Sequence, residues 1–551
     1  MTAALNRVVA PDQSAVLWPR PPRLRSWRAV ALTLTLAASL VPLTAHPNPA
    51  AVAAPAAPSF PSTNVAWQAA AVDADVDRLL AQARRENKPL LLYWGATWCP
   101  PCNRLKASFF NQQEFAVQAR SLLAVHVDGD RPGAQKLGAR FKVRGYPTVI
   151  VFDAGGAELS RLPGEAEPAQ ILAVMRNALA GGRPIKAVLA DARAGRTLSA
   201  NEWRLLAYYG WEIDEDQLVP ANDRPALLAE LASRSGSVAD AETSMRLWLK
   251  ALAASDDGKG LKPDAALRQR VQRVLSEPAV ARAQVDVLLY GADDMLKALT
   301  EAESPERKAL GAQFDAALAR LQADQSLSRD DRLSALLARV SVARVDTART
   351  DTQPKLPEPL LREVRELSTR MDREITDGYE RQSVITSAAH LLSQAGLWAD
   401  SDALLKANLS RSHSPYYLMS QLGGNARRLG RKEEALRWYE QAYQQSSGPA
   451  TRLQWGASYV SALVELSPQD APRIERAVSA VLTDAAQDKA AFYERSARSL
   501  QRVGTQLQKW NESGQHAAVL QRLRRQLDGV CGKLDSADAQ KAACERVLKP
   551  A

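Results

Sequence analysis

The stretch PLLLYWGATWCPPC, residues 89–102, constrains the fold more than any other part of the chain. Its apolar run has the length of a buried strand, and two cysteines follow where a helix can begin. Pro100 and Pro101 suit the first helical turn, because an N–H there would have no helical partner to lose. Cys99 and Cys102 are three residues apart, so their sulfurs can meet within one turn. The segment predicts a strand, a short loop and a helix that starts with a dithiol.

Strand-like and helix-like segments alternate around this stretch. Apolar runs of strand length lie at residues 89–94, 121–130, 147–153 and 157–164. Helical patterns lie at residues 73–88, 100–110, 112–120, 133–143 and 167–182. Such alternation predicts an α/β domain. The short AGG turn before the last strand predicts a hairpin, so we expect a mixed sheet.

The cysteine pair has three possible interpretations: a metal site, a redox pair or a purely structural pair. A structural zinc ion needs about four ligands. The chain has only one CxxC motif, and His126 is the nearest histidine in sequence, so we expect no metal. A redox pair fits better, because a helix N-terminus stabilises a thiolate and lowers the pKa of Cys99. We expect Cys99 to be the more exposed and reactive thiol, with the Cys102 N–H as its main-chain partner. The structural pair remains the alternative.

WCPPC after an apolar strand, together with VRGYPTVIVFD at residues 143–153, resembles the thioredoxin superfamily. The resemblance covers roughly residues 65–182. The stretches KPLLLYWGATWCPPCNRLK and SFFNQQEF resemble in particular the periplasmic thioredoxin-like branch. That branch includes the C-terminal domain of the transmembrane thiol:disulfide interchange reductase.

This resemblance implies roles for individual residues. Cys99 would attack a substrate disulfide, and Cys102 would resolve the mixed disulfide. The Tyr146–Pro147 peptide bond would be cis and would face the cysteine pair. Backbone beside Pro147 would pair with substrate as an extended strand, and we expect Trp98 at the rim of this site. By resemblance alone, reduction of substrate disulfides is favoured over oxidation.

Two positions depart from the family pattern. Classical thioredoxins keep a buried carboxylate six residues before the first cysteine, where this chain has Tyr93. The thiol of Cys102 therefore lacks its usual proton acceptor. Pro100 stands where thioredoxins have glycine, at a position that tunes redox potential.

Residues 185–551 have the pattern of amphipathic helices throughout. The clearest unit is LGGNARRLGRKEEALRWYEQAY, residues 422–443. It has small residues where two helices can cross closely and aromatic residues to fill the groove, which is typical of a tetratricopeptide repeat. Gly396 lies 34 residues before Gly430 in the same register. We expect an all-α solenoid of TPR-like repeats whose concave surface binds a peptide or protein. The alternative is an array of helix pairs that only holds the α/β domain in place.

The remaining cysteines, Cys531 and Cys544, are 13 residues apart. One continuous helix would separate them by about 20 Å, which is too far for a bond. Gly532 can end one helix, and Asp535 or Ser536 can cap the next. An antiparallel helix pair would bring the sulfurs together, so we expect a structural disulfide.

The N-terminus has the pattern of an export signal. A basic stretch precedes residues 29–45, which are uncharged and mostly apolar. This order predicts a signal peptide at residues 1–45, with cleavage after Ala45 or Ala53. A membrane anchor is expected only if residues 29–45 are retained. A Pro/Ala-rich linker at residues 46–62 would follow, and export predicts a periplasmic or secreted protein.

The formal net charge of +10 does not indicate a nucleic-acid partner. Lysine and arginine are scattered among acidic residues, with no long basic block, as on a solvated mixed-charge surface. The chain has no Walker motif or dinucleotide fingerprint, and we expect no cofactor.

Together, these patterns predict an exported thiol–disulfide oxidoreductase. The α/β domain at residues 63–182 would act on protein thiols and disulfides, and the helical repeats at residues 185–551 would bind protein partners. The rival hypothesis is a helical-repeat scaffold or chaperone-like binding protein. In that case the thioredoxin-like module would be a docking element.

Overall fold

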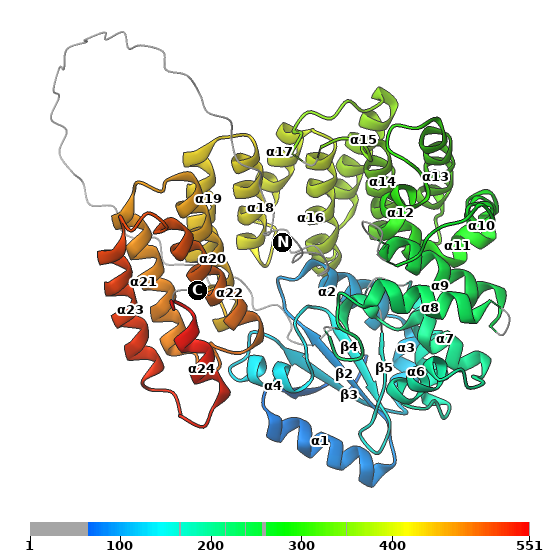
Figure 1. Cartoon of the computed structure of the whole chain (residues 1–551), viewed down its shortest axis with the longest axis horizontal. Helices are drawn as coiled ribbons and strands as arrows, with labels where there is room; N and C mark the ends of the chain where they lie inside the picture. Colours follow the sequence, from blue (N-terminus) through cyan, green and yellow to red (C-terminus); the bar gives the residue numbers. More distant parts are fainter. Residues whose placement is uncertain are drawn as a thin grey trace.

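The structure is a computed structural model that describes residues 64–549, apart from 163, 165–166, 215, 237–238, 256–259 and 349. The expected signal peptide, residues 1–45, and the linker, residues 46–62, lie outside the described residues. Within the described part, a mixed α/β domain comes first and an all-helical region follows (Figure 1). The predicted fold class is therefore confirmed.

The α/β domain is built on a five-stranded sheet with the order β1-β3-β2-β4-β5. The strands are β1 Gln68–Ala70, β2 Leu90–Gly95, β3 Leu123–Asp128, β4 Thr148–Phe152 and β5 Glu158–Leu162. Strands β1 and β2 run parallel to β3, whereas β4 is antiparallel to both β2 and β5. The sheet is mixed, as the AGG turn predicted.

Strand β2 is the central strand and leads directly to the cysteines. All its residues are buried, because helices cover both faces of the sheet, which explains its unbroken apolar run. Alternate residues point to opposite faces. Trp94 belongs to the core on one face, and Tyr93, which is opposite His126 in β3, belongs to the core on the other.

Helices flank the sheet on both sides. They are α1 Asp73–Glu86, α2 Pro100–Leu105, the π-helical turn η1 Lys106–Phe110, α3 Gln113–Ala119, α4 Ala134–Arg140 and α5 Pro168–Leu179. One face packs against α1 and α4. The other face packs against Phe109 and Phe110 of η1, against α3 and against α5.

The rest of the described chain forms helix after helix. Its first part contains α6 Ile185–Arg193, α7 Ala200–Tyr208, the 3-10 turn η2 Trp211–Ile213, α8 Arg224–Ser235, α9 Ala241–Ala254, α10 Ala265–Ser276, α11 Pro278–Ala283, α12 Val285–Leu299, α13 Pro305–Ala323 and α14 Arg329–Ala343. Its second part contains α15 Glu358–Glu374, α16 Gly378–Gln394, α17 Trp398–Asn408, α18 Pro415–Arg428, α19 Lys432–Gln445, α20 Pro449–Leu466, α21 Ala471–Gln487, α22 Glu494–Trp510, α23 Ala517–Cys531 and α24 Ala539–Arg546. None of these described helices is long and apolar enough to cross a membrane.

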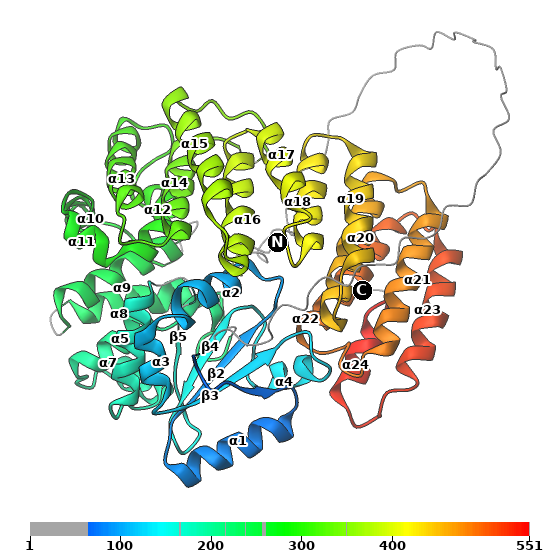
Figure 2. The ribbon, with the colours of Figure 1, turned by 180° about the vertical axis from the view of Figure 1, so that it is seen from behind.

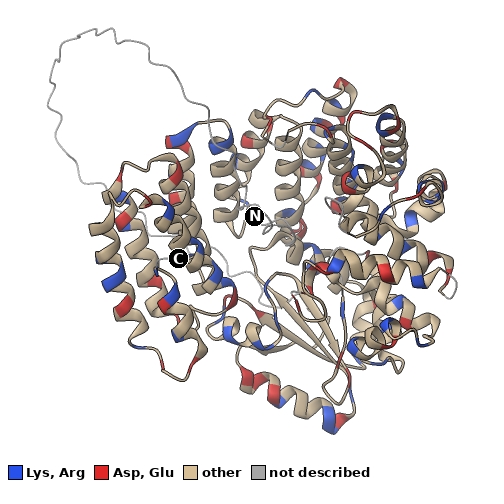
Figure 3. Cartoon of the chain, viewed as in Figure 1, with Lys and Arg blue, Asp and Glu red and all other residues tan. Residues whose placement is uncertain are grey.

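These helices form an arc that curves around the α/β domain, as the two opposite views show (Figures 1 and 2). Helix α16, near the middle of the arc, packs against α2, and α22, near its end, packs against α4. The α/β domain therefore occupies the inner side of the arc. Acidic and basic residues are interspersed along the helices (Figure 3).

The start of the arc shares a hydrophobic core with the sheet. One cluster of buried side chains runs from Phe110 through Ile171 of α5 and Trp203 of α7 to Leu247 of α9. Arg161 of β5, which is 0% exposed, adds hydrogen bonds across this junction, since its guanidinium donates to the Gln217 side chain. The first helices of the arc are thus fixed to the sheet.

The end of the arc has a different core. A second cluster joins the side chains of helices α18–α24 to Trp98, Cys99 and Cys102. We call the residues of these helices, 415–546, the cap segment. The cap segment meets the preceding helices through hydrogen bonds from Asn425 to Ser401 Oγ and Asp402 Oδ1 and through a small cluster of four buried residues, namely Ala389, Leu405, Leu418 and Leu422.

Two consecutive helix pairs, α16/α17 and α18/α19, span the segment whose sequence has the repeat pattern. Each pair turns at a glycine with positive φ, +79° at Gly396 and +72° at Gly430. In the second pair, a Cβ atom added to Gly423 would lie 3.1 Å from the ring of Tyr439. The glycine therefore allows the two helices to approach.

The C-terminal cysteines lie in an antiparallel helix pair. Helix α23 ends at Cys531, and its disulfide to Cys544 of α24 has a Cα–Cα distance of 5.7 Å. The predicted new cap at Asp535 or Ser536 was wrong, because Asp538 caps α24 by accepting a hydrogen bond from the Gln540 N–H. The loop between the helices is correspondingly longer than predicted.

Candidate active site

The cysteine pair sits where β2 passes into α2. Cys99 is the N-cap residue of α2, and Pro100 and Pro101 form its first turn. Cys99 and Cys102 are joined in a disulfide. The Cys102 N–H donates to Cys99 Sγ over 3.2 Å, which is the main-chain contact predicted from the two prolines.

The loop before β4 supplies the second part of the site. The Tyr146–Pro147 peptide bond is cis, as the resemblance implied. The carbonyl oxygen of Tyr146 lies 3.6 Å from Cys99 Sγ. Gly164 backs this loop, because a Cβ atom added there would lie 3.1 Å from Pro147 Cγ. Backbone next to Pro147 thus faces the cysteine pair.

Trp98, which we expected at the rim of the site, is buried. Its side chain is 5% exposed because the cap segment covers it. Tyr417 stacks on it at 6.0 Å between ring centroids, and Trp455 meets it edge-on at 6.2 Å. The Arg495 guanidinium lies 4.6 Å from the Trp98 ring, a cation–π geometry. This cover could not be predicted from local pattern, because it comes from residues more than 300 positions away.

Cys99 is the more exposed thiol of the pair, as predicted, but both cysteines are buried in this arrangement. Cys99 is 3% exposed, and Cys102 is 0% exposed. In the α/β domain alone, the end of β2 would face solvent. Helices α16 and α18–α24 fill that space.

Asp130 links the two parts of the molecule beside the cysteines. Its Oδ2 accepts hydrogen bonds from Trp98 Nε1 at 3.0 Å and from Thr451 Oγ1 at 2.6 Å. Its Oδ1 accepts from the Thr451 N–H at 2.8 Å. Burial and the nearby Asp128 raise the pKa of Asp130 to about 6, although these hydrogen bonds lower it. Gly448 makes room for this contact, since a Cβ atom added there would lie 2.8 Å from Asp130 Cβ.

Arg495 of α22 makes a second link, to the loop of the cis peptide bond. Its guanidinium lies 5.3 Å from the centroid of the Tyr146 ring. Its backbone N–H donates to Gln135 Oε1 at 3.0 Å, and Gln135 Nε2 donates to the Tyr146 hydroxyl at 2.8 Å. Both loops that border Cys99 are therefore held by the cap segment.

A buried ion-pair cluster links α2 to α14. Arg104 lies 3.5 Å from Asp330 and 3.4 Å from Asp331 of α14, and it also donates to the Tyr290 hydroxyl. Removing one partner of a buried ion pair costs about 3–5 kcal/mol. This cluster therefore fixes α2 to the middle of the arc.

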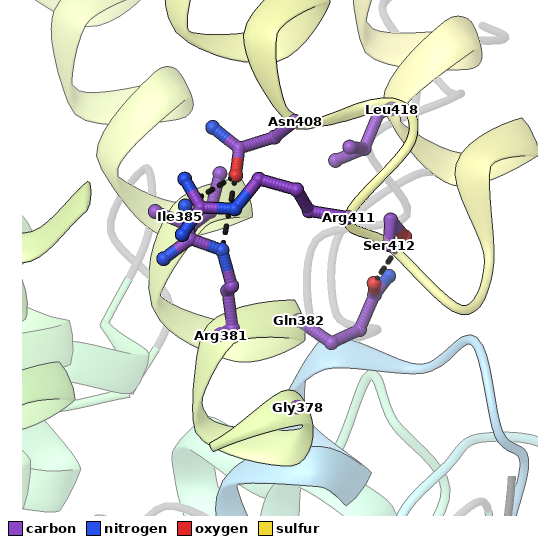
Figure 4. A pocket seen from close by; sticks show the side chains of 8 residues that line it. All are labelled: Gly378, Arg381, Gln382, Ile385, Asn408, Arg411, Ser412 and Leu418. Atoms are coloured by element: carbon purple, nitrogen blue, oxygen red, sulfur yellow. Dashed lines mark hydrogen bonds between the residues drawn. The ribbon is translucent and has the colours of Figure 1, made fainter. Parts of the chain in front are cut away.

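A narrow pocket lies between α16, α17 and the chain that follows α17 (Figure 4). Its lining includes Arg381 and Gln382 of α16, Asn408 of α17 and the following Ser412. Gln382 Nε2 donates to the Trp98 carbonyl oxygen at 3.4 Å, and Ser412 Oγ donates to Gln382 Oε1 at 2.6 Å. The Arg381 guanidinium donates to Asn408 Oδ1. These polar side chains thus form hydrogen bonds with one another and, through Gln382, with the backbone of the active-site loop.

Three titratable side chains lie on the sheet face behind the cysteines. Tyr93 is 0% exposed, its hydroxyl makes no hydrogen bond within the described residues, and burial raises its pKa. It stacks on His126, with centroids 5.1 Å apart. Burial, Lys106 and Arg131 lower the pKa of His126 to about 3. Burial also lowers the pKa of Lys106 to about 8, although Asp128 opposes this. The Tyr93 position therefore supplies no proton acceptor at neutral pH.

Asp130 could have been suspected from the sequence. It follows β3 as Cys99 follows β2, and the carboxyl ends of adjacent parallel strands meet at one edge of a sheet. Thr451 and Arg495 had no such signal. Among the described residues, no group of three or more His, Cys, Asp or Glu side chains is placed to hold a metal ion.

Comparisons with known proteins agree with the geometry. Residues 76–179 match the family model of a thioredoxin-like domain, so this part of the chain is a thioredoxin-like domain. The chain is 34% identical over 124 residues to the thiol:disulfide interchange protein DsbD 1 of Pseudomonas aeruginosa, covering 21% of each chain. It is 36% identical over 139 residues to the DsbD protein of Cronobacter sakazakii, covering 24% of this chain and 23% of that protein. Protein disulfide-isomerase A5 of the mouse is 35% identical over 82 residues, 15% of each chain. The chain spans about a fifth of the length of these DsbD relatives.

Proposed function

We propose that this protein is a thiol–disulfide oxidoreductase that exchanges disulfides with protein substrates through Cys99 and Cys102. The observation that carries the proposal is the geometry at the start of α2. A closed disulfide lies there, and Cys99 Sγ is 3.6 Å from the Tyr146 carbonyl oxygen, next to the cis bond of Pro147. The thiol:disulfide interchange and disulfide-isomerase names of the relatives support it.

In the reductive direction, the Cys99 thiolate attacks one sulfur of the substrate disulfide, and the other substrate sulfur leaves as a thiolate. The Cys102 thiol then loses its proton and attacks Cys99 Sγ. This releases the second substrate thiolate and forms the Cys99–Cys102 disulfide. Two electrons pass to the substrate, and two thiol protons end on its sulfurs. A protein dithiol must then reduce the enzyme again.

The other side chains of the site take supporting roles in this proposal. Trp98, Tyr146 and Pro147 border the bound substrate, whose chain pairs with backbone beside Pro147. Cys531 and Cys544 form a structural disulfide. Export by the N-terminal signal to the periplasm supplies an oxidising setting in which such a bond persists.

The helical region is proposed to be a TPR-like repeat domain, residues 185–551, that follows a catalytic domain at residues 63–182. The glycine turns of α16/α17 and α18/α19 support the repeat interpretation. A protein partner on the concave surface would meet the thioredoxin-like domain there, because that domain occupies the inner side of the arc. Partner binding and access to Cys99 would therefore depend on each other.

A trapping experiment with the full chain tests the proposal. Reduced Cys102→Ala should form a stable mixed disulfide with a protein substrate, and Cys99→Ala should form none. Reduced wild-type protein should also turn over insulin disulfides. If Cys102→Ala traps no partner although iodoacetamide alkylates its Cys99, the proposal is wrong. The full chain is required because the core of the α/β domain continues into α9.

The burial of Cys99 favours a second candidate function. With only 3% of Cys99 exposed, the thioredoxin-like domain would serve as a docking element inside a helical scaffold. This candidate predicts no turnover by any variant, including those in which Cys99 is readily alkylated.

A further inference from the structure

The cap segment covers the route by which a protein disulfide would reach Cys99. Such a substrate must place its own sulfur against Cys99 Sγ and its backbone beside Pro147. Trp98, at 5% exposure, and Cys99, at 3%, both lie in the hydrophobic cluster of helices α18–α24. A protein substrate therefore cannot reach Cys99 unless these helices are displaced.

Among the contacts that hold the cap segment on the α/β domain, two sets lie beside Cys99. The first packs Trp98 against Tyr417, Trp455 and Arg495. The second is the hydrogen-bonded seat of Asp130 on Thr451, whose N–H and Oγ1 both donate to the carboxylate. Both sets involve residues that border Cys99. The contacts that hold the cap segment in place therefore also determine whether a substrate can reach Cys99.

The two ends of the arc are attached differently. The first helices continue the core of the sheet, and Arg104 fixes α2 to α14 through a buried ion-pair cluster. The cap segment belongs to a separate core, which it shares with Trp98, Cys99 and Cys102. It meets α16 and α17 through a cluster of four buried residues and through hydrogen bonds from Asn425 to Ser401 and Asp402. Residues 409–414, between α17 and α18, form the backbone connection between the preceding helices and the cap segment.

We propose that the cap segment is a lid that closes over the Cys99–Cys102 pair and must swing away before a protein disulfide can react. The inference rests on the proposed function for its purpose. The lid itself concerns only access to Cys99, which can be measured without any turnover. The described arrangement is its closed state.

Gly448 offers a way to open the lid without changing the active-site loops. Its φ of +90° is strained for any other residue, and an added Cβ atom would lie 2.8 Å from Asp130 Cβ. Gly448→Ala should therefore force Thr451 and Asp130 apart. Gly514→Ala is the matched control, since Gly514 also has a positive φ, +80°, but nothing lies within 4 Å of an added Cβ atom. Thr451→Val is a milder second variant that removes only the Oγ1 donor.

The measurement is the rate at which a polyethylene-glycol maleimide labels Cys99 in the reduced full chain, read by peptide mass spectrometry. The labelling rate of a covered thiol scales with the open fraction. Wild-type protein and Gly514→Ala should be labelled slowly relative to the urea-unfolded chain. Gly448→Ala and Thr451→Val should be labelled about tenfold faster or more, since a hydrogen bond to a charged group is lost.

Three results would overturn the lid. They are labelling of wild-type Cys99 as fast as in the unfolded chain, no acceleration in either opening variant, and equal acceleration in Gly514→Ala. Insulin turnover of the same proteins separates the two proposals. Fast labelling of Gly448→Ala without turnover supports the lid and rejects the oxidoreductase, whereas turnover with fast labelling of wild-type protein rejects only the lid.

Discussion

At position 106 the chain carries a lysine whose side chain is only 1% exposed. Its ammonium group lies 4.9 Å from the centroid of the Tyr379 ring. Burial lowers its pKa from 10.5 to about 8, with Asp128 acting in the opposite direction. One pKa unit corresponds to about 1.4 kcal/mol. Keeping this lysine charged in the folded protein therefore costs roughly 3 kcal/mol.

This cost gives a pH dependence with a definite sign. Below pH 8 both the folded and the unfolded chain carry the charge, so the full cost is present. As pH rises from about 8 to 10.5, the folded protein loses the proton first, and the free energy of unfolding rises. Lys106→Met should remove this rise and raise the free energy of unfolding at pH 7. The gain should be about 1–2 kcal/mol after the lost contact with Tyr379 is subtracted.

Denaturant unfolding followed by circular dichroism at pH 7 and pH 10 measures both effects. Lys186→Met, at an exposed position of α6, is the matched control and should change neither. A lower free energy of unfolding for Lys106→Met at pH 7 would show that the lysine stabilises the fold through its contacts.

The active-site residues that could be predicted from the sequence are those set by local pattern. Cys99 and Cys102 follow from the strand, the prolines and the helix start, and Pro147 follows from the motif around it. The cover over them depends on contacts such as Thr451 with Asp130, which join residues 321 positions apart. No local periodicity reports such a pairing, so the burial of Trp98 and Cys99 could not be foreseen.

At the scale of elements, strands and helices were predictable where their apolar spacing was regular. Strand β1 was missed because its three residues are too few to show a period. The helix that follows Cys99 was expected to run as far as Phe110, yet α2 ends at Leu105 and the chain continues as the π-helical turn η1. Asp538, rather than Asp535 or Ser536, caps α24, because several acceptors in that loop satisfy the same capping pattern.

The helix pair α23/α24 carries its own prediction. A disulfide that closes a loop of this size stabilises by roughly 3 kcal/mol, and both cysteines are buried, at 4% and 0% exposure. Replacing both, Cys531→Ala with Cys544→Ala, should lower the thermal stability of the C-terminal helices. Disulfide exchange at Cys99 should not fall. Hydrogen exchange of α23 and α24, measured beside insulin turnover, checks both parts; unchanged protection with lost turnover would mean that this pair relays electrons.

At the scale of the whole molecule, the order of an α/β domain and a helical array was readable from the sequence, but their arrangement was not. Periodicity reports which face of a helix is apolar and does not report what covers it. The inner face of the arc was expected to bind a peptide or protein partner, yet the thioredoxin-like domain occupies it. The first helices of the arc complete the core of that domain, so a fragment without them should lose part of that core.

A fragment that ends at Gly182 should not fold on its own, because it lacks Trp203, Leu231 and the other residues that α6–α9 contribute to the shared core. The uncovered face of α5 would add to an apolar patch of a size that promotes association, roughly several hundred Å². A fragment of residues 64–254 ends after α9 and keeps every member of that cluster. We expect cooperative urea unfolding for the longer fragment and a broad transition with aggregation for residues 64–182. Equal midpoints for the two would mean that the shared core contributes little to the sheet. Since the longer fragment also lacks the cap segment, its Cys99 should be labelled by the bulky maleimide faster than in the full chain.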